Sequence, residues 1–277
     1  MQVKFWGVRG SIAVSGQGFG EVGGNTSCVE VISGEHRLIL DGGTGLKALG
    51  DAHGRKPLAA TVLFSHVHWD HIQGVPFFGP AFHPGSDLTL MGARRPTGGV
   101  REAVARQMKP PAWPVGPELL RGVKAYDDVP LDRTFDVGPF KVSAIDMHHP
   151  DGVVAYRVEA DGHALVYATD VEHGGRIEPE LVAFCAGADL IVHDAQYTQQ
   201  EYTGDDGGPG RRGWGHSTWG EAVELGARAG AGAVALFHHD PSRDDEGVRT
   251  LEHLADDALV GCGARAFAAR EGLQVSL

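Results

Sequence analysis

The feature that most constrains this chain is a dense group of metal-type ligands directly after an apolar strand. Residues 61–66 (TVLFSH) predict a buried strand, and the hexapeptide His66–His71 (HVHWDH) begins where it ends. The imidazoles of His66, His68 and His71 and the carboxylate of Asp70 are donors that a borderline cation such as Zn²⁺ prefers. The alternative, a polar loop with a capping aspartate, does not explain so many ligands. Four of them overcrowd one tetrahedral ion, so the spacing predicts two neighbouring ions with further ligands from elsewhere.

Similar side chains end three other predicted strands. His148 and His149 follow residues 140–147 (FKVSAIDM), Asp170 closes residues 164–170 (ALVYATD), and His238 and His239 end residues 233–239 (AVALFHH). Each of them alone is compatible with an ordinary surface residue. Their joint occurrence after separate strands favours a shared site, because functional side chains collect where a rigid scaffold ends.

Composition narrows the class of protein. The chain has 24 Lys and Arg against 36 Asp and Glu, a formal charge of −12, and so lacks the basic surface of a general nucleic-acid binder. Three widely spaced cysteines predict free thiols in a reducing compartment. No apolar signal core and no run of 18 apolar residues is present, so we expect a cytoplasmic protein that does not span a membrane.

The order of the expected elements predicts two sheets packed together with helices outside. A length of 277 residues suits one domain, 1–277. Besides the strands named above, we expect strands at 3–6, 28–33, 36–41, 87–92, 153–160, 189–195 and 265–268, and helices at 46–49, 100–108, 179–186, 218–229 and 246–259. The segment 203–215 is expected to be a loop, Trp69 to pack inside the protein, and Trp113 to form a pocket wall.

Short strings along nearly the whole chain follow the pattern of a known family. They are FWGVRGS, GGNTSC, LILDGGTG, FSHVHWDHIQG, HHPDGVVAYRVE, VYATD, LIVHDAQYT, GHST and LFHHDP. In these the chain resembles the metallo-β-lactamase superfamily, and within it the branch of ribonuclease Z and the bacterial cyclic phosphodiesterases. The resemblance implies an α/β fold, a four-layer αββα sandwich with two metal ions at one edge of the sheets.

The resemblance also implies which residues hold the metals. His66, His68 and His149 would bind the first ion, Asp70, His71 and His238 the second, and Asp170 would bridge the two. His149 is preferred to His148 because the family ligand precedes the proline, and His238 to His239 because the family ligand directly follows the apolar strand. Both doublets stay open at this point.

Four further residues are candidates around the metals. His216, in the string GHST, matches a family histidine that contacts phosphate or assists the leaving group; alternatively it is a surface residue ahead of a helix cap. Asp194 would orient a ligand or His216, or cap the next segment. Asp41 would support the ligand loop, since ligating histidines need an acceptor for their second N–H. Asn25, in a Gly-rich loop, would bind substrate or merely turn the chain.

The ligand residues predict a binuclear metal-dependent hydrolase, and the resemblance implies that it acts on phosphodiesters. Two metal ions lower the pKa of a water from 15.7 towards about 7. Asp70 would accept the proton of the water, and His216 would stabilise charge on the leaving group or protonate it. Zn²⁺ is the expected metal, with Mn²⁺ or Fe as alternatives.

The acidic charge and the lack of a clear basic arm favour a small or cyclic phosphodiester, such as a cyclic nucleotide, over a nucleic acid. Processing of tRNA 3′ ends and hydrolysis of lactones or thioesters are the alternative activities on the same metal site. A metal-bearing sensor with little turnover and a di-iron redox protein are alternatives of another class. As in its relatives, a homodimer is expected.

Overall fold

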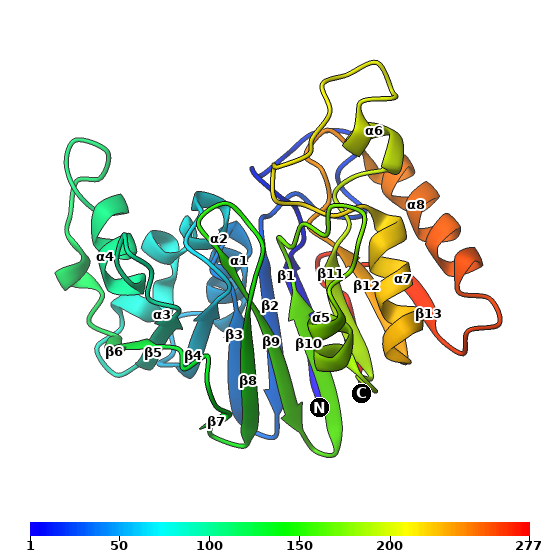
Figure 1. Ribbon diagram of the computed structural model, residues 1–277. Helices are drawn as coiled ribbons and strands as arrows, with labels where there is room; N and C mark the ends of the chain where they lie inside the picture. Colours follow the sequence, from blue (N-terminus) through cyan, green and yellow to red (C-terminus); the bar gives the residue numbers. More distant parts are fainter.

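The chain forms two seven-stranded mixed sheets that lie face to face, with helices on both outer sides (Figure 1). The computed structural model describes residues 1–277. The strand order is β14-β1-β2-β3-β4-β5-β6 in the first sheet and β13-β12-β11-β10-β9-β8-β7 in the second. The chain therefore completes nearly all of the first sheet before it begins the second, and only β14 returns.

The first sheet joins an antiparallel part to a parallel part. Strands β14, β1, β2 and β3 pair antiparallel, whereas β3, β4, β5 and β6 pair parallel. Its strands are β1 (Gln2–Gly7), β2 (Cys28–Ser33), β3 (His36–Leu40), β4 (Ala59–Phe64), β5 (Asp87–Gly92), β6 (Val123–Asp128) and β14 (Gln274–Ser276).

The second sheet repeats this plan. Strands β7, β8, β9 and β10 pair antiparallel, and β10, β11, β12 and β13 pair parallel. They are β7 (Phe135–Val137), β8 (Phe140–Met147), β9 (Val153–Ala160), β10 (His163–Ala168), β11 (Leu190–Asp194), β12 (Ala233–Phe237) and β13 (Arg265–Ala268).

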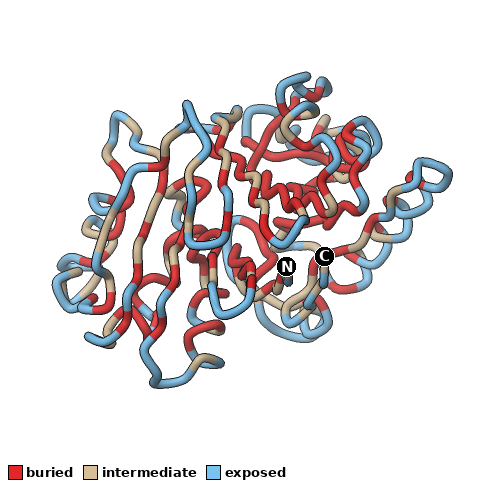
Figure 2. The backbone as a smooth tube through the Cα atoms, turned by 90° about the horizontal axis from the view of Figure 1, so that it is seen from below, coloured by how far each residue is buried: buried red, intermediate tan, exposed pale blue.

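The main core lies between the two sheets. A cluster of 27 buried hydrophobic residues joins the inner faces of both, for example Phe5 and Leu40 of the first sheet with Tyr156 and Phe237 of the second. Seen from below, buried residues run along the strands, and exposed residues gather in the connecting loops (Figure 2). The four-layer sandwich expected from the sequence is confirmed.

Separate apolar clusters attach the helices to the outer faces of the sheets. Helices α1 (Thr44–His53), α3 (Gly79–Phe82) and α4 (Val100–Gln107) cover the first sheet, and α5 (Pro179–Cys185), α7 (Trp219–Ala229) and α8 (Asp245–Ala258) cover the second. The connections also contain the short α-helices α2 (Trp69–Ile72) and α6 (Gln199–Thr203) and the 3₁₀ turns η1 (Val75–Phe77) and η2 (Pro117–Leu119). No helix is long and apolar enough to cross a membrane.

The topology gathers several loop segments at one edge of the sandwich. The carboxyl ends of β3, β4, β10, β11 and β12 lie at this edge because these strands run parallel within their sheets. Strand β8 runs in the same direction as β10, since each is antiparallel to β9 between them. Carboxyl ends of parallel strands are where α/β sheets place their ligands, and every predicted metal ligand follows one of these strands.

Candidate metal centre

Four strands deliver the seven predicted ligands to one place. Strand β4 leads into the loop that carries His66 and His68 and into α2 with Asp70 and His71. His149 follows β8, Asp170 follows β10 and His238 follows β12. All seven are buried except His68, whose side chain is 40% exposed.

The ligand atoms form two adjacent groups. His66, His68 and His149 make one, and Asp70, His71, Asp170 and His238 make the other, with the donor atoms of each group within 4.8 Å of one another. Asp170 lies between them: its oxygens are 3.3 Å from Nε2 of both His71 and His238, and 3.9 and 4.0 Å from Nε2 of His66 and His149. Two groups that share one carboxylate are the arrangement expected of a two-metal site.

Hydrogen bonds to Nδ1 of His66 and His71 turn Nε2 of each ring towards this centre. Nδ1 of His71 donates to Asp41 Oδ2 at 2.8 Å, and Nδ1 of His66 lies 3.1 Å from Ser65 Oγ, whose own proton goes to Asp41. The opposite nitrogens, Nε2 of His66 and of His71, are buried and have no hydrogen-bond partner. Buried polar atoms without a partner are costly, and a bound cation supplies the partner that both atoms lack.

The other two buried imidazoles are held in the same way. Nδ1 of His149 donates to the carbonyl of Gly215 at 2.7 Å, and Nδ1 of His238 donates to Gln196 Oε1 at 2.9 Å. Each histidine therefore presents the lone pair of Nε2 to the centre. A fixed tautomer of this kind is typical of metal-binding histidines.

The charges of the site also fit divalent cations. Burial lowers the pKa of His149 to about 4, so its imidazole is neutral, as a ligand must be. Burial lowers the pKa of His71 as well, but Asp70, Asp170 and Asp41 around it outweigh burial and raise that pKa well above its usual value. Three carboxylates around one imidazole demand positive charge at this place, which bound cations supply.

Several backbone positions at this edge are strained. The non-glycine residues Ser11, Asp41, Asp170 and His238 all have a positive φ, between 56° and 63°. Such residues cost free energy and persist where the surrounding structure holds them, often at functional sites. Here the strain accompanies Asp170 and His238 in the cluster, Asp41 beside His71, and Ser11, whose backbone N–H donates to Asp70 at 2.8 Å.

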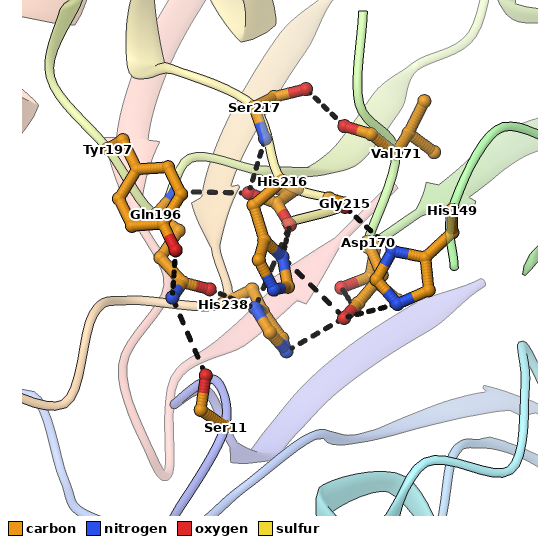
Figure 3. Close-up of polar contacts among 12 residues, drawn as sticks. Ser11, His149, Asp170, Val171, Gln196, Tyr197, Gly215, His216, Ser217 and His238 are labelled. Atoms are coloured by element: carbon orange, nitrogen blue, oxygen red, sulfur yellow. Dashed lines mark hydrogen bonds and ion pairs between the residues drawn. The ribbon is translucent and has the colours of Figure 1, made fainter. Parts of the chain in front are cut away.

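His216 lies beside His149, Asp170 and His238 of the cluster (Figure 3). Asp194 holds its ring. Its Nδ1 donates to Asp194 Oδ2 at 2.8 Å and is 3.7 Å from Asp170. Burial lowers the pKa of His216, but Asp194 and Asp170 outweigh burial and raise it to about 9. Asp194 accepts the proton on Nδ1 of His216, so the two residues form a hydrogen-bonded pair next to the metal ligands.

The start of helix α7 fixes the position of His216. Thr218 is the N-cap: its hydroxyl accepts from the N–H of Glu221, whose carboxylate accepts from the N–H of Thr218. Asp194 also accepts from the N–H of Ser217 at 3.2 Å and from the N–H of Gln196 at 3.0 Å. Asp194 therefore contacts both His216 and the backbone of the two segments that flank it.

The structure distinguishes the members of the two histidine doublets. His149 lies in the cluster, whereas His148 is exposed. His238 lies in the cluster, whereas His239 points away and bonds the carbonyl of Ala269 at 3.0 Å.

Two other predictions differ from the structure. The amide of Asn25 donates to Glu271 at 2.9 Å, which holds a loop and gives no support to a role in substrate binding. Trp69 was expected to pack inside the protein, and this is wrong: it is 61% exposed, because it faces outward from the single turn of α2. Trp113 does line a cavity, together with Trp69 and Phe77.

Sequence reasoning missed several supporting residues. Gln196 orients His238, Ser65 links Asp41 to His66, and Glu172 binds the N–H groups of Gly213 and Gly215 at 2.7 Å. Gln196 lies in the string LIVHDAQYT, two residues after Asp194, and this position could have suggested a role at the site. Glu172 had no such signal, because its partners are the hydroxyl of Tyr202 and backbone groups of a loop distant in the sequence.

Fold and site together define a metal-dependent hydrolase built on a sandwich of two sheets. Residues 36–239, well over half of the chain, match the family model described as "Beta-lactamase superfamily domain". The chain therefore belongs to the β-lactamase superfamily.

Two named relatives are similar in sequence. "Probable metallo-hydrolase YhfI" of Bacillus subtilis is 28% identical over 208 residues, which are 74% of this chain and 76% of that protein. "Ribonuclease Z" of Haloarcula marismortui is 22% identical over 323 aligned positions, which cover 99% of this chain and 96% of that protein.

Solved structures share the fold over the whole chain. Zn²⁺-bound PqqB from Methylobacterium extorquens superposes with a TM-score of 0.73 at 18% identity, and each chain is covered completely. A diphosphatase from the PhnP family superposes with a TM-score of 0.71 at 16% identity, covering 100% of this chain and 97% of that one. At these identities the likeness establishes the fold.

Proposed function

We propose that this protein is a phosphodiesterase with two metal ions that acts on a small or cyclic phosphodiester. The observation that carries the proposal is the place of His216, a buried histidine held by Asp194 beside the metal cluster. A protonated imidazole at this place suits a substrate that is anionic and a leaving oxygen that needs a proton.

The residues that would hold the metals are those of the two groups. His66, His68 and His149 would bind one ion, and Asp70, His71 and His238 the other, with Asp170 between them. When bound, two divalent cations neutralise charge on the substrate oxygens and make hydroxide available near neutral pH. The set of imidazole and carboxylate donors fits Zn²⁺, and the Zn²⁺-bound neighbour supports this choice; Mn²⁺ and Fe use the same donors.

His216, Asp194 and Asp70 would then have separate roles in the reaction. His216 carries a proton on Nε2 when charged and would donate it to the departing oxygen, while Asp194 keeps Nδ1 occupied and the ring in place. Burial raises the pKa of Asp70, but His71 and His238 outweigh burial and hold it well below the usual range. Such a carboxylate is a weak base, so Asp70 suits metal binding and orientation of the attacking water better than proton abstraction.

The size of the available space supports a small substrate. A cavity of about 500 Å³ opens beside His66 and His68, within the range of small-molecule pockets. The net charge of −12 disfavours a long polyanion. A second candidate, cleavage of precursor tRNA, is favoured by the match to a ribonuclease Z over 99% of this chain.

A substrate panel tests the proposal. Protein reconstituted with Zn²⁺ or Mn²⁺ is assayed on cyclic nucleotides, bis-p-nitrophenyl phosphate, a precursor tRNA, and a lactone and thioester. We expect turnover of the small phosphodiesters and little of the others. Faster cleavage of the tRNA would favour the second candidate, and turnover of only the lactone or thioester would contradict the proposal.

The histidine doublet provides matched variants for the same assay. His149→Ala removes a ligand and is expected to reduce turnover at least about 100-fold. The control is His148→Ala, because His148 is the exposed neighbour on the same loop and should leave turnover unchanged. Equal loss in both variants, or none in either, would contradict the metal assignment.

A further inference from the structure

The segment Arg9–Ser11 follows β1 and lies against the end of β12, where the ligand His238 stands. The N–H of Gly10 donates to the carbonyl of His239 at 3.0 Å, and the N–H of His239 donates to the carbonyl of Val8 at 3.0 Å. Two backbone hydrogen bonds therefore fix this segment, which follows a strand of the first sheet, beside a ligand that follows a strand of the second.

Gly10 leaves no room for a side chain beside His238. An added Cβ would lie 2.4 Å from Nδ1 of His238 and 2.9 Å from Oε1 of Gln196. These two atoms form the hydrogen bond of 2.9 Å that orients His238. The φ of Gly10 is not positive, so glycine is needed here for the close approach and not for the backbone conformation.

Ser11 contacts a second ligand of the same metal group. Its backbone N–H donates to Oδ2 of Asp70 at 2.8 Å, and the same oxygen lies 3.2 Å from Nε2 of His238. The hydroxyl of Ser11 also faces the amide of Gln196 (Figure 3). Gly10 and Ser11 thus contact one ligand from each sheet, so the spacing between Asp70 and His238 depends on where this segment lies.

The side chain of Arg9 holds the segment in place, and it is completely buried. Its Nε donates to the carbonyl of Gly23 at 2.8 Å, and one terminal nitrogen donates to the carbonyls of Asp240 and Arg243, at 3.3 and 2.6 Å. The other terminal nitrogen lies 3.9 Å from Asp245. Arg9 therefore ties the Gly-rich loop after β1 to the chain that follows β12, although its guanidinium bonds none of the metal ligands.

We infer that the Arg9–Ser11 segment is a positioning element for the second metal group. It sets the distance between Asp70 and His238 and acts through these two ligands. Gly10 is the specific requirement, because any side chain there would push His238 away from Gln196. The inference rests on the metal assignment of the proposed function, but it holds for any class of substrate. The affinity for the second ion should therefore depend on this segment, whereas the affinity for the first should not.

A metal titration of the Gly10→Ala variant tests this inference. Metal-free protein is titrated with Zn²⁺ in competition with a chelator, and the binding steps are assigned with His149→Ala and His71→Ala, which each remove a ligand from one group. We expect the step of the second group to lose about 10–100-fold in affinity, as when a partner that orients a ligand is lost, and the step of the first group to stay unchanged. Co²⁺ adds a spectroscopic measurement, because its visible absorption depends on ligand geometry, and only the bands of the second group should change.

Gly20→Ala is the matched control for this variant. Gly20 lies on the same loop, its φ is not positive, and an added Cβ there meets no atom within 4 Å. Both of its binding steps should equal those of the unchanged protein. Two unchanged steps in Gly10→Ala would overturn the inference and leave the metal assignment intact, and equal weakening of both steps would overturn it as well.

Arg9→Lys tests the same inference if Gly10→Ala does not fold. Lysine keeps the buried positive charge near Asp245 but lacks the fork of N–H groups that reaches the three carbonyls. We expect the second step to weaken about 3–10-fold and the first to stay unchanged. The control is Arg249→Lys, because Arg249 is exposed and pairs with Glu21 on the same loop. Weakening of neither step, or of both alike, in Arg9→Lys would overturn the inference.

These titrations need no substrate, so they separate the inference from the proposed function. A loss confined to the second step would uphold the positioning role even if no phosphodiester were hydrolysed, and that result would overturn only the proposed function.

Discussion

At the scale of single residues, Asp41 shows how one buried side chain organises the ligand loop. Its carboxylate accepts from the N–H and the hydroxyl of Ser65, from Nδ1 of His71 and from the hydroxyl of Tyr167, all between 2.7 and 2.8 Å. Four donors converge on it, so the carboxylate is fully satisfied. Asp41 thereby connects both sheets to the histidine whose other nitrogen faces the centre.

Replacing Asp41 by asparagine should weaken metal binding. An amide offers one acceptor oxygen where the carboxylate offers two, so the NH₂ group of the new side chain would face donors of its neighbours. We expect metal affinity to fall about 10–100-fold and the free energy of unfolding to fall by about 1–3 kcal/mol. Chelator competition and urea unfolding measure the two effects.

Asp161→Asn is the control for this variant. Asp161 also has a positive φ, but it lies in the exposed turn between β9 and β10, away from the ligands. The metal affinity of the Asp161→Asn variant should equal that of the unchanged protein. If Asp41→Asn also kept full affinity, the supporting role of Asp41 would be refuted.

A second residue-scale prediction concerns His173. Its Nε2 donates to Nε2 of His193, which must be the acceptor because Nδ1 of His193 donates to the carbonyl of Asp194. Burial, together with His193, lowers the pKa of His173 from 6.5 to about 3. The unfolded chain therefore binds a proton between these pH values that the folded protein does not, and stability falls as the pH drops below 6.5.

His173→Gln should make the protein less sensitive to acid. Glutamine still donates to His193 but does not titrate, so the variant should lose about 2 kcal/mol less stability than the unchanged protein between about pH 8 and pH 5. Urea unfolding of metal-free protein measures this difference. The control is His253→Gln on the exposed side of α8, and an equal loss in all three proteins would show that His173 is not responsible.

At the scale of elements, the Gly-rich loop before α7 is held to the metal ligands by Glu172. One carboxylate oxygen accepts from the hydroxyl of Tyr202 and the N–H of Gly213, and the other accepts from the N–H of Gly215, all at 2.7 Å. Gly215 has φ +90°, and an added Cβ would lie 2.1 Å from Nδ1 of His149. The close approach lets the carbonyl of Gly215 fix His149.

Glu172→Gln should loosen this loop. The glutamine amide has one acceptor oxygen, so at least one of the loop N–H groups loses its partner, and His149 is held less firmly. We expect the first metal group to lose about 3–10-fold in affinity while the second is little changed. A two-step metal titration resolves the two groups.

The exposed Glu178 and Glu180, near Glu172 in the same cavity, provide the comparison. Glu178→Gln should leave both steps of the titration unchanged. Equal weakening of both steps in Glu172→Gln would indicate general destabilisation and contradict a positioning role.

The elements also show what the sequence could and could not predict. Strands with clear alternation and turn signals, such as β2, β5, β8 and β9, were predicted with their observed bounds. Most of the missed elements, such as α2, α6, β7 and β14, have only three to five residues, too few for a periodic pattern. The six-residue β6 was also missed, because its sequence VKAYDD shows no clear alternation. Strand β14 exists because it pairs with β1, a contact between the two ends of the chain that no local signal reports.

In the candidate site, too, the residues with a local sequence signal were predicted and those without one were missed. The ligand-type residues stood out because they end apolar strands, and the doublets were resolved only by three-dimensional placement, since both members of each pair are histidines. Glu172 and Ser65 were not predicted, because they act through backbone groups or through other side chains that only the fold brings near.

At the scale of the whole molecule, the protein gathers its metal-type ligands where its two sheets meet. One edge brings together the imidazole and carboxylate donors of both groups, with His216 beside them. Two sheets of like plan, each with parallel strands ending at that edge, make this possible. The central claim is that ligands from both sheets share a pair of metal ions.

Anomalous X-ray diffraction from crystals of metal-reconstituted protein, measured at the absorption edge of the metal, locates the ions themselves. We expect two peaks about 3.5–4 Å apart. One should lie against His66, His68 and His149, the other against Asp70, His71 and His238, with Asp170 between them. No peak at this edge of the sandwich, or a single ion that leaves one group without metal, would contradict it.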